Sequence, residues 1–533
     1  MGIAFTQEEI DAEEKRPKRK VAVLIGYAGT GYKGMQISAT EKTIEGDLFQ
    51  AFVKAGAISK ANADDPKKAS LVRCARTDKG VHAAGNMISL KLIVEDEDIV
   101  QKINQNLPDQ IRVWGIERTI GSFSSYQACD SRWYEYLIPS HAFLPPHPSS
   151  WMAKKLEEFA ADESGDRSGY DRRQQEVQGF WDQVDEQFIK PLLDAIDEDI
   201  RPDVIKALSG EEEANEGAAK SAADVEQSVK LGASVSAVNA GLPTDSEKTE
   251  EAAIIINDPA LRSSEAESSE PTQSVPGPDP SQDLPNEDRD RQLRLRAATK
   301  QLRAAYSQTK RRYRIPPERI DRIQACLSKY VGTANFHNFT ILKTFRDPSA
   351  KRHIKSFVVD RKPVLIGDGL DEEKAEWLSL KVHGQSFMMH QIRKMVGMVA
   401  LLVRCGSDPN TLTESLGDER YSIPKVPGLG LLLERPVFNS YNTIQAPKHD
   451  RPPLEFSKFQ KEINEFKQRE IYERMFREEG KTDEFSRFFN HIDNFKEPHF
   501  LYVTSRGLEA TKGAEKKLTF EDSDGEQADG GDG

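Results

Sequence analysis

The sequence has few cysteines, and they do not form close pairs. Only Cys74, Cys129, Cys326 and Cys405 occur among 533 residues, without the spacing of a zinc module or the density of a secreted disulfide scaffold. Long apolar runs are also missing. None approaches the roughly 18 residues of a membrane span, and the charged N-terminus does not resemble a secretory signal. We therefore expect a soluble protein of a reducing intracellular compartment, with no membrane partner.

Hydrophobic residues are also scarce for a chain of this length. They make up 37% of the sequence and charged residues 30%, which is more polar than a compact protein of this size needs. Part of the chain is therefore expected to be disordered. The net charge of −13 argues, taken alone, against a nucleic-acid partner. The acids gather, however, in segments that we predict to be unfolded, such as 279–290 and 521–532, and this leaves room for a basic working surface.

Composition and periodicity divide the chain into five segments. They are a basic N-terminal tail (1–19), a strand-rich segment (20–145), an insertion (146–290), a second strand-rich segment with a basic entry helix (291–445) and a helical extension with an acidic disordered tail (446–533). The insertion is predicted to be largely disordered, with a helical piece near 179–208. The cluster Lys15–Lys20 is typical of a nuclear localisation signal or of a solvated tail that touches phosphates.

Individual elements follow from the hydrophobic periods. Strands are expected at 21–25, 71–74, 86–92, 112–118, 132–139, 353–359 and 376–383. Helices are expected at 44–54, 97–106, 316–330, 388–405 and, in the extension, 459–475. Between Glu163 and Glu176 the sequence is polar and has no period, so no element is predicted there.

Two patterns have more than one interpretation. Gly29–Gly34 follows a strand and matches G-x-G-x-x-G, but no helix begins at the third glycine, as a dinucleotide site requires. We expect a tight turn instead. The basic run Arg291–Arg314 is a candidate phosphate-binding face or, alternatively, a solvated helix that offsets the acidic insertion.

The run Arg76–Ala83, with the sequence R-T-D-K-G-V-H-A, lies between two predicted strands. Its composition alone indicates a turn. It resembles the R-T-D-x-G-V-H-A motif of the TruA-type tRNA pseudouridine synthases and is very similar to their eukaryotic, fungal-like branch, called pseudouridine synthase one. Further family motifs occur in the expected order at Tyr27–Gln36, Asn104–Pro108, Arg132–Tyr136, Gly332–Phe339, Met389–Gly397 and Gly428–Leu433. Ala28 and Met35 depart from the first of these.

The resemblance implies an α+β fold with a mixed, largely antiparallel central sheet, built from two related halves (20–145 and 291–445) and flanked by helices. It implies isomerisation of uridine to pseudouridine in folded RNA, chiefly tRNA, with small nuclear and messenger RNA as further substrates. Because the reaction involves no net redox change, no cofactor or metal is needed. A structural zinc bound by dispersed ligands is left open. The resemblance also implies a nuclear enzyme that acts as a monomer.

The resemblance assigns the catalytic role to Asp78, acting on a flipped-out uridine. Arg393 would pair with this carboxylate, Tyr134 would face the base, and Leu431 would line the pocket. We add Arg76 as a phosphate contact that helps to hold the everted nucleotide. Burial raises the pKa of a carboxyl group, so an opposing guanidinium is needed to keep Asp78 ionised.

The alternatives to these assignments are ordinary structural roles and two other functions. Arg393 could be an exposed helix residue and Tyr134 a packing residue, whereas His82 is expected to be a structural hydrogen-bonder rather than a general base. A base deaminase needs H-x-E and P-C-x-x-C for zinc, and both are missing. A non-catalytic RNA clamp would tolerate loss of Asp78, so the presence of Asp78, Tyr134 and Arg393 together favours the enzyme.

Overall fold

The computed structural model describes residues 5–38, 40–162, 165–208, 286–367 and 370–512. The chain forms two compact units, one from 1–188 with 305–515 and the other from 189–304 with 516–533. In the second unit the described part is helical. None of the described helices has the length and apolarity that a membrane crossing requires.

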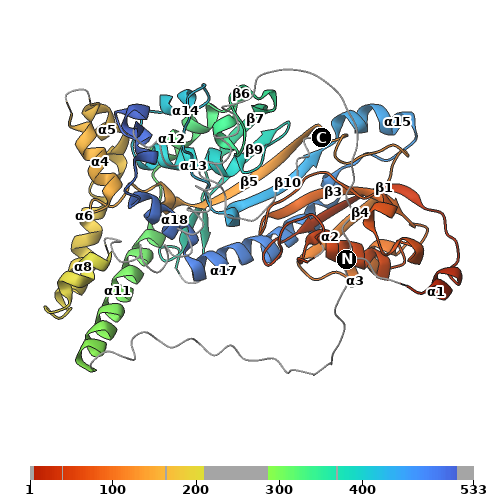
Figure 1. Cartoon of the computed structure of the whole chain (residues 1–533), viewed down its shortest axis with the longest axis horizontal. Helices are drawn as coiled ribbons and strands as arrows, with labels where there is room; N and C mark the ends of the chain where they lie inside the picture. The colour runs from red at the N-terminus through yellow and green to blue at the C-terminus, as the bar shows by residue number, and fades with distance from the viewer. Residues whose placement is uncertain (1–4, 39, 163–164, 209–285, 368–369, 513–533) are drawn as a thin grey trace, which may run out of the picture. The chain divides into compact units, whose positions relative to one another are not determined.

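A ten-stranded mixed sheet lies in the first unit (Figure 1). Its strands are β1 (Arg19–Tyr27), β2 (Val72–Arg73), β3 (His82–Leu92), β4 (Ile111–Arg118), β5 (Ser131–Pro139), β6 (Gly332–Asn335), β7 (Lys351–Val359), β8 (Val364–Ile366), β9 (Ala375–Gly384) and β10 (Leu431–Val437). The order is β4-β1-β3-β10-β5-β9-β7-β6, with β2 beside β3 and β8 beside β9. The pairing of β3 with β10 is parallel, and the other pairings are antiparallel. The predicted mixed, largely antiparallel sheet is confirmed.

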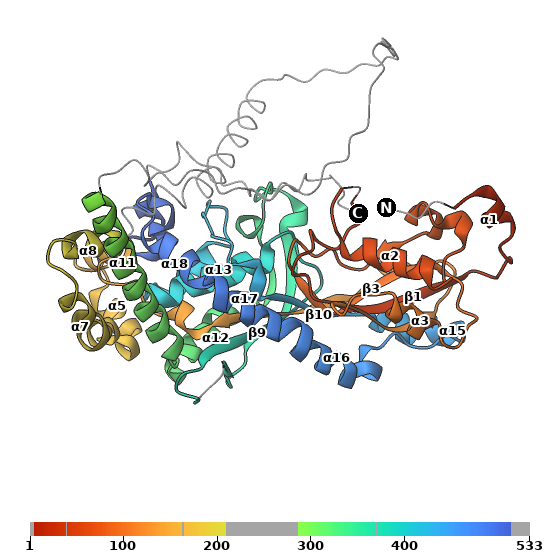
Figure 2. The ribbon, with the colours of Figure 1, turned by 90° about the horizontal axis from the view of Figure 1, so that it is seen from below.

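Helices flank this sheet, and Figure 2 shows α2 and α16 on opposite sides of β1, β3 and β10. Before residue 209 the helices are α1 (Gln7–Asp11), α2 (Ile44–Lys54), α3 (Ile99–Gln105), α4 (Trp151–Ala160), α5 (Arg167–Gln174), α6 (Phe180–Val184), α7 (Lys190–Asp194) and α8 (Arg201–Leu208). After residue 285 they are α11 (Asn286–Arg312), α12 (Pro317–Ser328), α13 (Gln391–Arg404), α14 (Asn410–Glu414), α15 (Ala446–Lys448), α16 (Gln460–Phe466), α17 (Glu473–Thr482) and α18 (Glu484–Asp493). Of these, α7, α8 and most of α11 belong to the second unit.

Helix α2 illustrates how the sequence fixes an element. The side chain of Thr43 caps its first turn by accepting a hydrogen bond from the Gly46 amide, as N-cap threonines do. Leu48 and Phe52 lie four residues apart and are fully buried, so one face of the helix packs on the protein. The predicted bounds, 44–54, are those observed.

The region 163–176 is the clearest error of the sequence-based prediction. It contains helix α5, although its sequence has no hydrophobic period. Asp166 caps the helix by accepting from the Gly169 amide at 2.9 Å, and the Arg173 Nε donates to the carbonyl of Gly406 at 2.6 Å. Contacts with distant residues therefore stabilise it. Within the predicted insertion, 151–174 contains α4 and α5, although no helix was predicted there, and the stretch near 179–208, predicted to be helical, contains α6, α7 and α8. Residues 286–290 belong to α11, and 209–285 lie outside the described residues.

The predicted helix of the C-terminal extension packs across the sheet. It comprises α16, a π-helical segment (Lys467–Tyr472) and α17. The rings of Trp114 and Phe466 meet edge to face at 5.3 Å. A Cβ added to Gly115 would come within 2.5 Å of the Phe459 ring, so glycine at this strand position allows the extension to lie close to the sheet.

Candidate active site

Asp78 lies in the loop between β2 and β3, and the glycine-rich turn after β1 supports this loop. The Met35 amide donates to the carbonyl of Thr77 at 3.1 Å. A Cβ on Gly29 would come within 2.2 Å of the Val81 carbonyl oxygen, so only glycine fits there. The run Gly29–Gly34 therefore forms the tight turn that we expected and positions the loop of Asp78.

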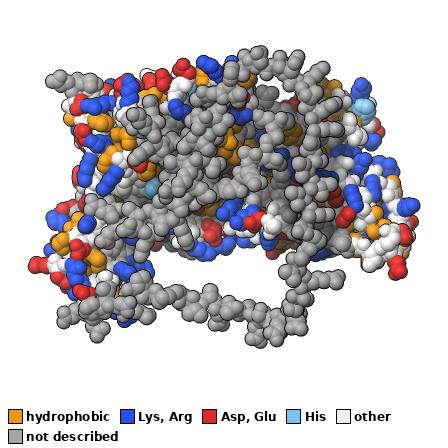
Figure 3. Space-filling model, in the orientation of Figure 1, with side chains coloured by type: hydrophobic (Ala, Val, Ile, Leu, Met, Phe, Trp, Pro, Cys, Tyr) orange, Lys and Arg blue, Asp and Glu red, His pale blue; other side chains and the backbone are white. Residues whose placement is uncertain are grey.

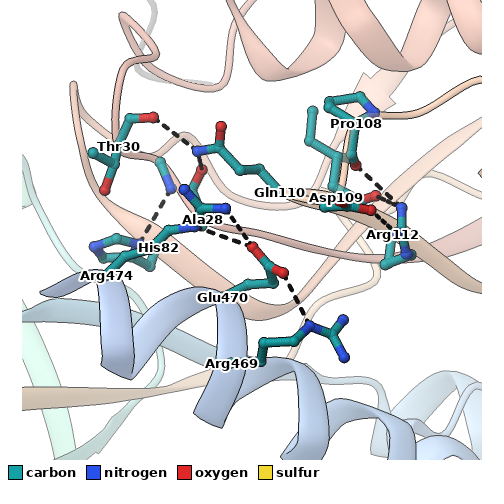
Figure 4. A network of polar contacts seen from close by, with 12 residues as sticks. Ala28, Thr30, His82, Pro108, Asp109, Gln110, Arg112, Arg469, Glu470 and Arg474 are labelled. Carbon is teal, nitrogen blue, oxygen red and sulfur yellow. Dashed lines mark hydrogen bonds and ion pairs between the residues drawn. The ribbon is translucent and has the colours of Figure 1, made fainter.

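His82 holds the same turn from the opposite side. Its Nδ1 accepts from the Gly29 amide at 3.2 Å. Burial, aided by the positive charge of Arg474, lowers the pKa of His82 to about 4. The ring is therefore neutral, as expected of a structural hydrogen-bonder. Figure 4 shows His82 below the turn and Gln110 beside it, whose Nε2 donates to the Thr30 carbonyl at 2.9 Å.

The side chain of His390 contacts Asp78, with 3.2 Å between Nδ1 and Oδ2. The side chain of His390 is 3% exposed and that of Asp78 27%. His390 has a left-handed backbone conformation, with φ 60°, directly before α13, so the helix begins at Gln391 and not at Met388 as predicted. Such a conformation is costly for a residue with a side chain and often occurs at functional sites. His390 was not among the site residues predicted from the sequence, although it lies in the motif Met389–Gly397.

Three neighbouring side chains determine the ionisation of Asp78. Burial alone would raise the pKa of this carboxyl group. The hydrogen bond and charge of His390, and the charges of Arg393 and Lys425, outweigh that effect and lower the pKa below its usual value. Asp78 is therefore a carboxylate at neutral pH, stabilised by these three side chains and still partly open to solvent.

Arg393 lies in the first turn of α13 and is buried, unlike an exposed helix residue. Its Nε donates to the carbonyl of Val426 at 2.7 Å. A Cβ added to Gly428 would lie 3.5 Å from the guanidinium carbon. Its charge acts on Asp78 and also on the hydroxyl of Tyr136. The structure thus brings Asp78, His390 and Arg393 together at one site.

Tyr134 and Leu431 lie on the same face of the sheet. In the register of β5 and β10, Tyr134 is opposite Leu433 and Tyr136 is opposite Leu431, so all four side chains point to one side. Tyr134 is buried and meets the ring of Phe387 edge to face at 5.2 Å. Burial raises the pKa of Tyr134, and its hydroxyl is neutral. Because β10 lies between β3 and β5, these residues are close to the strand that follows Asp78.

Exposed groups surround this part of the site. Arg76 is exposed and makes no ion pair with any residue in the described ranges. Three large apolar side chains are also exposed: Leu342 (65%), Phe345 (42%) and Met389 (40%). Met389 precedes His390, and its carbonyl accepts from the Thr340 hydroxyl at 3.0 Å. We call these three residues the rim: Met389 precedes the residue that contacts Asp78, and the segment that bears Leu342 and Phe345 contacts Met389 through Thr340.

The basic run Arg291–Arg314 fits a solvated helix that offsets acidic residues better than it fits a phosphate-binding face. In the second unit, Arg294 lies 2.7 Å from Asp197 and 3.2 Å from Asp199, and Arg291 lies 2.5 Å from Asp203. These pairs offset the charge of α11. Within the described ranges, no group of three His, Cys, Asp or Glu side chains is arranged to hold a metal ion.

Removing the imidazole of His390 is expected to shift the pH profile of catalysis. His390→Gly deletes the ring, and glycine adopts the left-handed backbone without strain. Since His390 lowers the pKa of Asp78, its loss raises that pKa. The acid limb of kcat/KM, measured on the RNA substrate, should therefore move to higher pH. His353→Gln, at an exposed strand position, is the control. An unmoved limb in His390→Gly would contradict the role of His390.

Comparisons with known proteins show which family the chain resembles. A family model described as "tRNA pseudouridine synthase" matches residues 326–439, which include His390, Arg393 and Leu431. The chain is similar to tRNA pseudouridine synthase 1 of Yarrowia lipolytica (40% identity over 500 residues, 93% of this chain and 78% of the relative) and of Schizosaccharomyces pombe (39% over 525 residues, 96% and 90%). It is also similar to the tRNA pseudouridine(27/28) synthase of Saccharomyces cerevisiae (33% over 423 residues, 79% and 85%).

Proposed function

The chain belongs to the tRNA pseudouridine synthase family, and from this premise we propose that it isomerises uridine to pseudouridine in folded tRNA, with the Asp78 carboxylate as the catalytic group. The observation that carries the assignment is the partly exposed Asp78, which contacts His390 and is kept ionised by His390 and by the charge of Arg393. The names of the relatives support tRNA as the substrate.

The reaction explains why an ionised carboxylate is needed. The bond between ribose C1′ and uracil N1 breaks, the uracil turns, and C5 joins C1′. N1 ends with a proton and C5 loses one, so atoms and electrons balance without a cofactor. A carboxylate acts here as a nucleophile or as the partner of a cationic sugar. The hydrogen bond of His390 and the charge of Arg393 keep Asp78 in the form that either route requires.

We assign Tyr134 to packing against the uracil. Its ring lies on the face of the sheet that also bears Leu431, and a planar side chain suits a flipped-out base. A role in removing the C5 proton fits less well. Burial raises the pKa of Tyr134, and a neutral phenol is a poor proton acceptor.

The rim supports RNA as the substrate class. Apolar side chains such as Phe345 and Leu342 offer surfaces on which unpaired bases stack, and exposed cations such as Arg76 contact phosphates. In Figure 3, Lys and Arg side chains also gather at the right, over the N-terminal part of the first unit. Recognition by shape and backbone follows from such a surface.

We further propose a nuclear enzyme that acts as a monomer, without a cofactor, and also on small nuclear and messenger RNA. The cluster Lys15–Lys20 supports nuclear import because Lys15 and Lys18 are exposed. The redox-neutral reaction supports the absence of a cofactor. The monomer and the additional RNA classes rest on the family resemblance alone.

Incubation of the purified chain with tRNA that carries tritium at uridine C5 tests the function. C5 loses its hydrogen when it bonds to C1′. We therefore expect the amount of tritium released into water to equal the amount of pseudouridine mapped in the same RNA. A folded chain that binds this tRNA but releases no tritium would be an RNA clamp, and the proposed enzyme would be rejected.

A further inference from the structure

We propose that Cys74 and Cys129 form an oxidation-sensitive dithiol beside the active site, which a peroxide-class oxidant converts to a disulfide. The modification itself is independent of the proposed function. Only its effect on RNA modification rests on that function.

The fold brings these two cysteines together from different segments. The chain between β4 and β5 runs along β2, where the Ser125 hydroxyl donates to the Val72 carbonyl at 2.9 Å. Arg132 then donates from Nη2 to the carbonyl of Cys74, also at 2.9 Å. Cys129 lies between these two anchors in the chain. Its thiol donates to the Ser131 carbonyl at 3.3 Å and also interacts with the Cys74 thiol. Both cysteines are free thiols.

The two thiols differ in reactivity. The hydrogen bond with Cys74, helped by the charge of Arg132, lowers the pKa of Cys129 to about 7 against the opposing effect of burial. Cys129 is half-buried, whereas Cys74 is buried, so Cys129 is the thiol that we expect a small oxidant to reach first. Burial raises the pKa of Cys74, which therefore stays a thiol. A thiolate that reacts first beside a thiol that resolves the product is the arrangement of a redox-sensitive pair.

The proposed steps balance. The Cys129 thiolate attacks one oxygen of hydrogen peroxide, the O–O bond breaks, and hydroxide leaves to become water. The Cys74 sulfur then attacks the sulfenic acid, the S–S bond forms, and the second oxygen leaves as water with the thiol proton. The peroxide gains the two electrons that the dithiol loses.

Closure of the bond should disturb catalysis because of where the pair lies. Cys74 is four residues before Asp78, and Cys129 is five residues before Tyr134. The sulfurs must approach to about 2.05 Å, and Arg132, which holds the Cys74 carbonyl, also acts on the Tyr134 hydroxyl. We therefore expect the disulfide to lower activity reversibly.

Peptide mass spectrometry under non-reducing conditions tests the modification. After hydrogen peroxide, the wild-type chain should yield a Cys74–Cys129 cross-linked peptide that dithiothreitol separates. Cys129→Ser should give no such peptide, whereas Cys326→Ser should still give it, because Cys326 is buried and its pKa is raised to about 11. If peroxide leaves both thiols reduced, or oxidises Cys129 without the cross-link, the proposal is overturned.

Activity measured on the same samples tests the consequence. Oxidised wild-type protein should lose roughly tenfold or more in kcat/KM and recover in dithiothreitol, whereas Cys129→Ser should keep its activity in peroxide. A cross-link without loss of activity would overturn the regulatory effect. If peroxide still forms the cross-link but the reduced protein has no activity, the proposed function would be rejected and the modification would stand.

Discussion

Asp78→Asn is expected to abolish pseudouridine formation, with a loss of roughly 10⁴-fold or more in kcat, while tRNA binding is retained. The amide has the shape of the carboxylate but is neither a nucleophile nor a negative charge. Because the Asp78 side chain is partly exposed, contacts His390 and only senses the charge of Arg393, the fold should not depend on its charge. Pseudouridine mapping and a tRNA-binding assay on one preparation check both statements.

Asp109→Asn is a matched control for this substitution. Asp109 lies in the turn before β4 and pairs with Arg112 at 2.8 Å (Figure 4). The same chemical change at this exposed position should leave kcat unchanged. If Asp78→Asn formed product as fast as Asp109→Asn, Asp78 would not be the catalytic group.

Lys467→Met is expected to destabilise the protein by about 3–5 kcal/mol, because it leaves buried carboxylates without their cation. Lys467 reaches from the extension to the far side of the sheet, where its Nζ lies 3.3 Å from Glu135 and also contacts Glu434. The side chain of Lys467 is 14% exposed, that of Glu135 4% and that of Glu434 18%. Burial by itself would raise the pKa of Glu135, but Lys467 and several hydrogen bonds, including one from Tyr472 at 2.6 Å, hold it at about 2.

Thermal unfolding measures this loss, with two variants for comparison. Lys458→Met removes an exposed pair with Glu117 and should cost less than about 1 kcal/mol. Adding Glu434→Gln to Lys467→Met should restore part of the stability. Without Lys467, the folded-state pKa values of Glu135 and Glu434 rise. The loss in free energy of unfolding relative to wild type should therefore shrink as the pH falls through the range where these two carboxylates become protonated. A melting temperature equal to that of Lys458→Met would contradict the buried-charge account.

Elements that are stabilised locally could be predicted from the sequence. Strands β1, β4 and β5 carry apolar runs, and α2 has both a cap and an apolar face, so their predicted bounds agree with the structure to within two residues. Helix α5 could not be predicted, because its stability comes from Arg173 and Gly406, which are far apart in the chain. The insertion of β10 between β3 and β5 is likewise a pairing of distant segments that no local period reveals.

The site could be predicted only in part. The motif around Asp78 and the one around Arg393 pointed to residues that the structure brings together. The role of His390 was missed because it depends on a left-handed backbone at one residue, which tertiary contacts impose and composition does not encode. The pairing of Cys74 with Cys129 also escaped notice, since the two cysteines are distant in sequence and only the packing of the β4–β5 connection against β2 brings them together.

An RNA complex of the inactive Asp78→Asn variant gives the most direct test. If the account is right, one uridine of the bound tRNA is turned out of its stack, with its C1′ about 3–3.5 Å from the side chain of residue 78 and its base against Tyr134. A bound tRNA whose target uridine stays stacked, or is held by other residues away from Asp78, would contradict it.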